Sequence, residues 1–109
     1  MLIYHIVPSD VWAAFDTDLY KPQTLDTEGF IHASFREQID GVIARYYADA
    51  GRLVVLGIET DRLMSRVVNE PSTGNEIYPH IYGPVNRDAI VSIAERTIGR
   101  RIMRRLNRR

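Results

Sequence analysis

The chain has 109 residues, and its content of 45% hydrophobic and 26% charged residues is close to that of ordinary globular proteins, which excludes disorder as the main state. It has no cysteine, which excludes a disulfide scaffold, a thiolate zinc site and a cysteine nucleophile. No apolar run approaches the roughly 20 residues that span a bilayer, and no basic stretch precedes the N-terminal apolar run, so we expect a cytoplasmic protein without a signal peptide.

The charges are unevenly placed, although the formal net charge is zero. The last ten residues, RRIMRRLNRR, hold six of the 14 basic residues, so residues 1–99 carry eight basic against 14 acidic side chains. We therefore expect one acidic domain over residues 1–99, which is a normal size for a domain, and a basic tail over residues 100–109. The acidic body is a poor surface for nucleic acid, whereas the tail is suited to contact with nucleic acid or another anionic partner.

The first third of the chain contains short strand and helix patterns. The apolar run Leu2–Val7 predicts a strand that Pro8 ends. Ser9–Phe15 is typical of a helix capped by its first residue, with its large apolar side chains on one face. Tyr20–Asp26 contains a Lys-Pro pair and is predicted to be irregular. Gly29–Ala33 is predicted to be a second short strand.

A capping box is the clearest local signal in the sequence. In Ser34-Phe35-Arg36-Glu37, the Ser34 hydroxyl and the Glu37 carboxylate could each satisfy the other's free backbone N–H group. Apolar residues then recur at helical spacing from Ile39 to Tyr46. We expect this helix to stop at Ala50-Gly51.

The second half of the chain predicts more strands. Leu53–Ile58 is a nearly continuous apolar run typical of a buried strand, and Arg66–Glu70 predicts another. Pro71–Asn75 has the composition of a turn. Pro79–Pro84 is predicted to be a short extended piece, and Ala89–Ile98 a last strand. Because the spacing is too short for repeated βαβ crossovers, we expect an α+β domain with mostly antiparallel sheet and a few short helices.

Three histidines, all in strand-like segments with aromatic neighbours, are the candidates for chemistry. They are His5 in Tyr-His-Ile, His32 in Phe-Ile-His-Ala-Ser, and His80 in Tyr-Pro-His-Ile-Tyr. The two prolines around His80 predict an exposed ring on a fixed backbone. A histidine at such a position can donate a hydrogen bond or act as a general base near neutral pH.

Other interpretations of these residues stay open at this point. A histidine on a strand commonly bonds a backbone carbonyl and has only a structural role. Three imidazoles could also bind a metal ion, but no pair has the spacing of adjacent ligands, so we assign no metal-binding residue. Tyr78 and Tyr82 could stack on a base or a nicotinamide ring, or could simply cover a sheet.

The three histidine motifs resemble a bacterial family catalogued as domain of unknown function 952. The resemblance covers residues 1–95 and rests on Tyr4–Val7, Thr27–Ser34 and Pro79–Pro84. That family is in turn similar to the ADP-ribosyltransferase fold, whose split, mostly antiparallel sheet would apply here. The resemblance implies a cleft for a small nucleotide-like ligand, with NAD as a candidate cofactor.

The resemblance also implies roles for individual residues. His5 would bond a ribose hydroxyl, and the backbone beside it, at Ile6, would receive a nicotinamide amide. His32 and Ser34 would line the cleft together with Tyr4, Tyr78 and Tyr82. His80 stands near the position of a late glutamate that stabilises positive charge at the anomeric carbon, a role that histidine cannot fill.

Two classes of function follow from these observations. One is an enzyme with a histidine-lined cleft for a nucleotide or an ADP-ribose-like ligand, such as a transferase or a 2′-phosphotransferase, in which His5, His32 and His80 are catalytic. The other is a binding or interaction module that has kept the fold and lost the chemistry.

Overall fold

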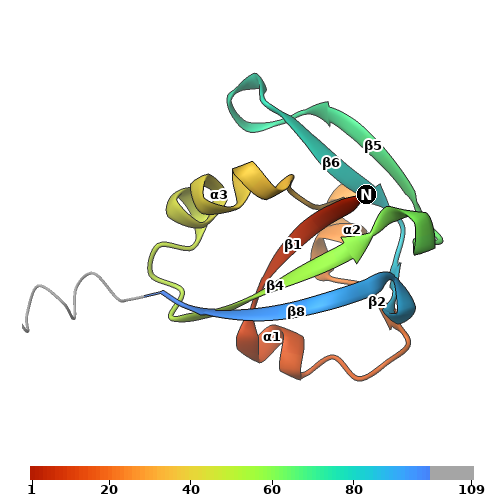
Figure 1. Ribbon diagram of the computed structural model, residues 1–109, viewed down its shortest axis with the longest axis horizontal. Helices are drawn as coiled ribbons and strands as arrows, with labels where there is room; N and C mark the ends of the chain where they lie inside the picture. The colour runs from red at the N-terminus through yellow and green to blue at the C-terminus, as the bar shows by residue number, and fades with distance from the viewer. Residues whose placement is uncertain (99–109) are drawn as a thin grey trace, which may run out of the picture.

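The strands of residues 1–98, the part of the chain that the computed structural model describes, form three small antiparallel sheets (Figure 1). The strands are β1 (Leu2–Pro8), β2 (Leu19–Tyr20), β3 (Ile31–His32), β4 (Arg52–Glu59), β5 (Arg66–Pro71), β6 (Ile77–Tyr82), β7 (Val85–Asn86) and β8 (Ile90–Thr97). The sheet orders are β1-β4-β8, β2-β7 and β3-β6-β5. The expected basic tail and its apolar stripe lie outside the described residues.

The helices are short. They are α1 (Ser9–Ala13), α2 (Gln23–Glu28) and α3 (Ile39–Tyr46), and the 3-10 turns are η1 (Arg36–Gln38), η2 (Thr60–Arg62), η3 (Thr73–Asn75) and η4 (Arg87–Ala89). The predicted α+β class with antiparallel sheet and a few short helices is confirmed. No helix within residues 1–98 has both the length and the apolar character needed to cross a membrane.

Within the β1-β4-β8 sheet, β1 and β4 are covered on both faces, because both strands carry apolar side chains on each face. On one face, Leu56 and its neighbours form a cluster against which Trp12 of α1 packs. On the other face, Leu53 and Val55 pack with Ile43 of α3. The alternation of side chains along a strand thus places α1 and α3 on opposite sides of the sheet.

The prediction of irregular structure for Tyr20–Asp26 is wrong, because the proline starts a helix. Pro22 lies at the N-cap of α2, where a missing N–H has no cost. Gly29 ends α2 in the left-handed region (φ 85°), which glycine adopts without a steric penalty. The expected strand over Gly29–Ala33 is therefore reduced to β3.

The predicted capping box lies one residue too early. Ser34 is drawn into a bridge with Tyr4 instead, and the backbone N–H of Phe35 donates to Gln38 Oε1 at 2.9 Å. The helix also ends at Tyr46 rather than at Ala50-Gly51. At the start of α1 the N-cap is the proline before Ser9, and no side chain caps the helix.

Two glycines give opposite stability predictions. Gly29→Ala forces a Cβ into left-handed backbone, so we expect a loss of about 1 kcal/mol in the free energy of unfolding. Gly41 lies inside α3 with no atom within 4 Å of an added Cβ, so Gly41→Ala should gain about 0.5–1 kcal/mol. Urea denaturation of both variants checks this, and equal effects would contradict the assigned backbone conformations.

Candidate functional site

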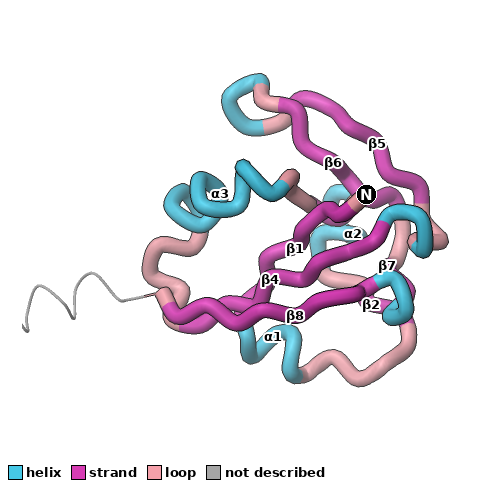
Figure 2. Tube along the Cα trace, in the orientation of Figure 1, coloured by secondary structure: helices cyan, strands magenta, loops and turns pink. Residues whose placement is uncertain are grey.

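A groove of about 350 Å³ runs between α3 and the β5–β6 hairpin, which Figure 2 shows facing each other. Its lining residues are His32, Ala33, Ser34, Val42, Tyr46, Tyr47, Ser72, Thr73 and Tyr78. A recess of about 90 Å³ is lined by His5, Ile6, Thr24, His32, Ser34, Val42 and Tyr47. Because four residues line both spaces, the groove and the recess form one continuous site.

Polar contacts hold the two walls of the groove together. The Tyr46 hydroxyl on α3 lies 2.7 Å from the Thr73 hydroxyl in the turn of the hairpin. Arg45 donates to the Tyr78 hydroxyl at 2.7 Å, and Gln38 donates to a backbone oxygen at the start of β6 at 2.8 Å. The walls are therefore joined across the groove by side-chain hydrogen bonds from α3 and the turn before it.

His5 lines the recess, and both of its ring nitrogens are bonded to protein atoms. Its Nδ1 is 2.7 Å from the His32 backbone oxygen, and because a carbonyl only accepts, Nδ1 carries the proton. Its Nε2 therefore accepts from the Tyr20 hydroxyl at 2.8 Å. Trp12 and Phe15 pack edge-on against the Tyr20 ring. Burial lowers the pKa of His5 to about 4, so the ring is neutral at pH 7.

The recess borders an open edge of β1. Tyr4 exchanges both backbone hydrogen bonds with Ser34 (N···O 2.9 and 2.7 Å), so the Tyr4 backbone faces away from β4. Backbone groups alternate in direction along an antiparallel strand, so the N–H and C=O of Ile6 face the same way. No strand within residues 1–98 pairs with β1 on that side beyond Ser34. The Ile6 side chain also lines the recess.

His32 is the histidine that lines both the groove and the recess. Its Nε2 lies 3.1 Å from Glu28 Oε1, across the left-handed turn at Gly29 that joins α2 to β3. About half of the His32 side chain (48%) is exposed. The ring is thus oriented by a carboxylate while one nitrogen remains able to contact a ligand.

His80 lies behind His32 and is buried, although the sequence predicted an exposed ring. It is 3% exposed, because Phe30 stacks on its face with ring centroids 4.2 Å apart. Its Nδ1 lies 2.7 Å from Glu70 Oε1, which also accepts from Tyr82. These two hydrogen bonds, with that from Tyr82 the larger influence, lower the pKa of Glu70. The buried Nε2 of His80 has no hydrogen-bond partner within residues 1–98.

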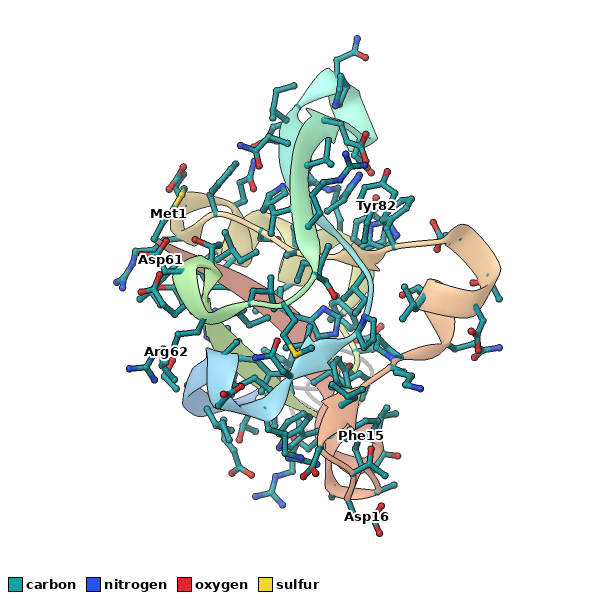
Figure 3. All side chains as sticks on the ribbon, turned by 90° about the vertical axis from the view of Figure 1, so that its right-hand side faces the viewer. Met1, Phe15, Asp16, Asp61, Arg62 and Tyr82 are labelled. Atoms are coloured by element: carbon teal, nitrogen blue, oxygen red, sulfur yellow. The ribbon has the colours of Figure 1, made fainter. Side chains whose placement is uncertain are left out.

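The structure brings some of the predicted site residues together and separates others. Those that line the groove or its recess are His5, Ile6, His32, Ser34 and Tyr78. Those that do not are Tyr4, His80 and Tyr82. The Tyr4 hydroxyl accepts from Arg36 at 3.0 Å, and Tyr82, marked in Figure 3, lies with Phe30 and Glu70.

Sequence reasoning missed the α3 wall of the groove and the hairpin turn that faces it. The missed lining residues are Thr24, Ala33, Val42, Tyr46, Tyr47, Ser72 and Thr73. The one available signal was the pair Tyr46-Tyr47 at the end of the predicted helix, where two large aromatic rings follow an apolar face. No lysine, arginine, aspartate or glutamate of residues 1–98 lines either space, so the lining suits the uncharged ring and sugar groups of a ligand, and the charged groups of such a ligand would lie outside the two spaces.

The ring nitrogens of the three histidines are bonded mainly to protein atoms. Within the described part of the chain, no group of three or more His, Asp or Glu residues is placed to hold a metal ion. His5 uses both ring nitrogens on protein atoms, and His80 is bonded to Glu70. The metal alternative therefore gains no support from the arrangement of residues 1–98.

The sheets and groove define a small α+β protein with an apolar, aromatic-walled cleft. The chain belongs to the family described as protein of unknown function (DUF952), whose model matches residues 6–93. This confirms the family resemblance seen in the sequence. A search of curated proteins gives no match.

Two solved structures of one bacterial protein are similar to this chain. The crystal structure of protein CC0527 from Caulobacter crescentus is 26% identical, with a TM-score of 0.77 over 98% of this chain and 99% of that chain. The solution NMR structure of CC0527 is 30% identical, with a TM-score of 0.72 over 85% and 82% of the two chains. Neither is described as an ADP-ribosyltransferase, so these structures do not support the finer expectation of that fold.

Burial of neutral His5 makes stability depend on pH. The unfolded chain takes up a proton at His5 below its ordinary pKa of 6.5, whereas the folded chain does so only near about 4. Stability should therefore fall as the pH is lowered through this window, by about 2 kcal/mol between about pH 7 and about pH 5. Urea denaturation at both pH values, with His5→Gln as the comparison, measures it. An equal loss in His5→Gln would contradict the assignment.

The two His–Glu pairs should respond differently to loss of the carboxylate. Glu70→Ala leaves Nδ1 of the buried His80 without its partner, so we expect a clear fall in the urea midpoint. Glu28→Ala removes the partner of the half-exposed His32, where water replaces the lost bond, so the midpoint should barely move. Equal midpoints for the two variants would show that His80 does not depend on Glu70.

Proposed function

We propose that the groove binds a nucleotide or an ADP-ribose-like ligand. The observation that carries the proposal is the continuous cleft with tyrosines from both walls and a recess at the free edge of β1. The exposed ring of Tyr46 suits a planar base, because aromatic side chains stack on the faces of bases. The N–H and C=O of Ile6 would offer one donor and one acceptor, the pair that a carboxamide requires.

His32 is the histidine best placed to contact the ligand. It lines both parts of the site, and Glu28 orients its ring. Ser34 beside it offers a hydroxyl. His32 and Ser34 would therefore bond the sugar hydroxyls, and His32 would supply any acid–base step.

His5 and His80 would act as positioning residues under this proposal. His5 fixes the backbone of His32 through a hydrogen bond, and its Nε2 is already taken by Tyr20. A direct contact from His5 to a ribose would require the Tyr20 hydroxyl to move. His80 packs against the His32 ring, with ring centroids 5.4 Å apart.

A non-catalytic binding module is the second candidate. The observation that favours it is the lack of any carboxylate among the described lining residues. Transfer chemistry at an anomeric carbon develops positive charge that a carboxylate would stabilise, and neutral side chains do this poorly. The enzyme would release nicotinamide from NAD, whereas the module would bind the ligand and release nothing.

An NMR titration with NAD, ADP-ribose and phosphorylated nucleotides tests the binding proposal. Amide signals of Ser34, Tyr47 and Thr73 should shift together at one affinity. No shift of these signals with any of the ligands would overturn the proposal. Chromatographic assay of free nicotinamide in the same samples separates the enzyme from the module.

Two tyrosines provide a matched test of stacking. Tyr46→Ala should weaken binding about tenfold, because an aromatic ring stacked on a base contributes about 1–3 kcal/mol. Tyr82→Ala removes an exposed tyrosine that lies outside the groove, and it should leave the affinity unchanged. Calorimetric titration measures both, and equal losses would contradict the assigned binding face.

A further inference from the structure

The strand β8 is an open edge. Among the strands of residues 1–98 it pairs only with β4, in the sheet order β1-β4-β8, and Figure 1 shows it as the border of that sheet. From Val91 to Thr97 every residue is exposed, whereas β4 is almost entirely buried. Val91 and Ile93 are 45% and 56% exposed. A long edge strand with exposed apolar side chains is a template for pairing with another strand.

The backbone of β8 presents hydrogen-bonding groups along this edge. The backbone N–H and C=O of Tyr4 point away from β4, so those of its partner Gly57 point toward β8. Backbone groups alternate along a strand, so the N–H and C=O of Val55 also point toward β8, where they meet those of Ala94. Ile93 and Glu95, on either side of Ala94, therefore direct their N–H and C=O outward. The register shift between β4 and β8 leaves Val91 without a Cα partner on β4.

We propose that two copies of this chain form a dimer by pairing their β8 edges antiparallel about Ser92. With the two-fold axis at Ser92, Val91 of each copy lies opposite Ile93 of the other, so the exposed apolar side chains cover one another. Shifting the axis by one residue, to Ile93, would instead place Val91 opposite a glutamate. With the axis at Ser92, the outward N–H and C=O of Ile93 in one copy bond those of Val91 in the other, as an antiparallel pair requires.

The basic tail fits this arrangement. Antiparallel pairing directs the chain beyond β8 of one copy toward the start of β8 in the other. Three aspartates lie near the start of β8. The Arg87 N–H donates to the Asp18 backbone oxygen at 3.0 Å and β2 pairs with β7, so the α1–β2 loop with Asp16 and Asp18 lies beside the turn that contains Asp88. The guanidinium of Arg87 is bonded to backbone oxygens of the α1–β2 loop. The six arginines of the tail would thus meet an acidic surface of the second copy.

The length of the tail is sufficient for this contact. Residues 99–109 span up to about 36 Å when extended, which is longer than β8 itself. One strand per copy buries little surface, so the tail contacts should add to the affinity, and salt should weaken them. The basic tail of one copy would then attract the acidic body of the other.

Sedimentation equilibrium over the micromolar range tests the dimer. The wild-type chain should be dimeric, and Ile93→Lys should be monomeric because an edge lysine blocks pairing. Val11→Lys is the matched control: it changes a similarly exposed side chain (50%) on α1 and should remain dimeric. Circular dichroism confirms that both variants fold. A monomeric wild-type chain, or a dimer that survives in Ile93→Lys, overturns the proposal.

Cysteine cross-linking tests the register, since the natural chain has no cysteine. Ser92→Cys places one thiol opposite its copy in a non-hydrogen-bonded pair, where the Cα separation of about 4.5 Å permits a disulfide. Glu95→Cys faces residue 89 of the other copy and should not cross-link. Deletion of residues 99–109 should weaken the dimer and remove most of its salt dependence. Equal cross-linking of the two cysteine variants, or a dimer of unchanged affinity after deletion, overturns the arrangement.

Discussion

The pair of hydrogen bonds made by neutral His5 is the constraint on which the site depends. One bond fixes the backbone of His32 on β3, and the other fixes Tyr20 on β2. Strands from three different sheets therefore meet at one imidazole ring. Because the ring is buried, a charged form would lose far more solvation than it could regain. The position of the groove relative to β1 follows from this neutral ring.

Much of the fold was predictable because local signals agree with the tertiary structure. The long apolar runs became β1 and β4, and the final pattern became β8. The failures have physical causes. The capping signal at Ser34 was overridden by its bridge to Tyr4, which no local pattern encodes. Pro22 was taken as a loop signal but lies at the N-cap of α2, where its missing N–H removes no hydrogen bond of the helix.

The candidate site was only partly predictable, because proximity in space depends on register. The pairing of His32 with His80 across β3 and β6 brings two of the three histidines side by side. Phe30 then covers His80, which the sequence around His80 alone could not indicate. The wall formed by α3 was missed because its tyrosines are ordinary residues of an amphipathic helix until the hairpin faces them.

The hairpin that forms the outer wall of the groove is joined to α3 chiefly by hydrogen bonds. The Tyr46–Thr73 contact is exposed to water, and those from Gln38 and Arg45 are partly so. Such bonds contribute about 0.5–1.5 kcal/mol each, because water replaces them when they break. The apolar clusters of the sheet stay intact when these bonds break. The width of the groove can therefore change at a small cost in free energy while the rest of the fold stays fixed, and ligands of different thickness would fit between the same two walls.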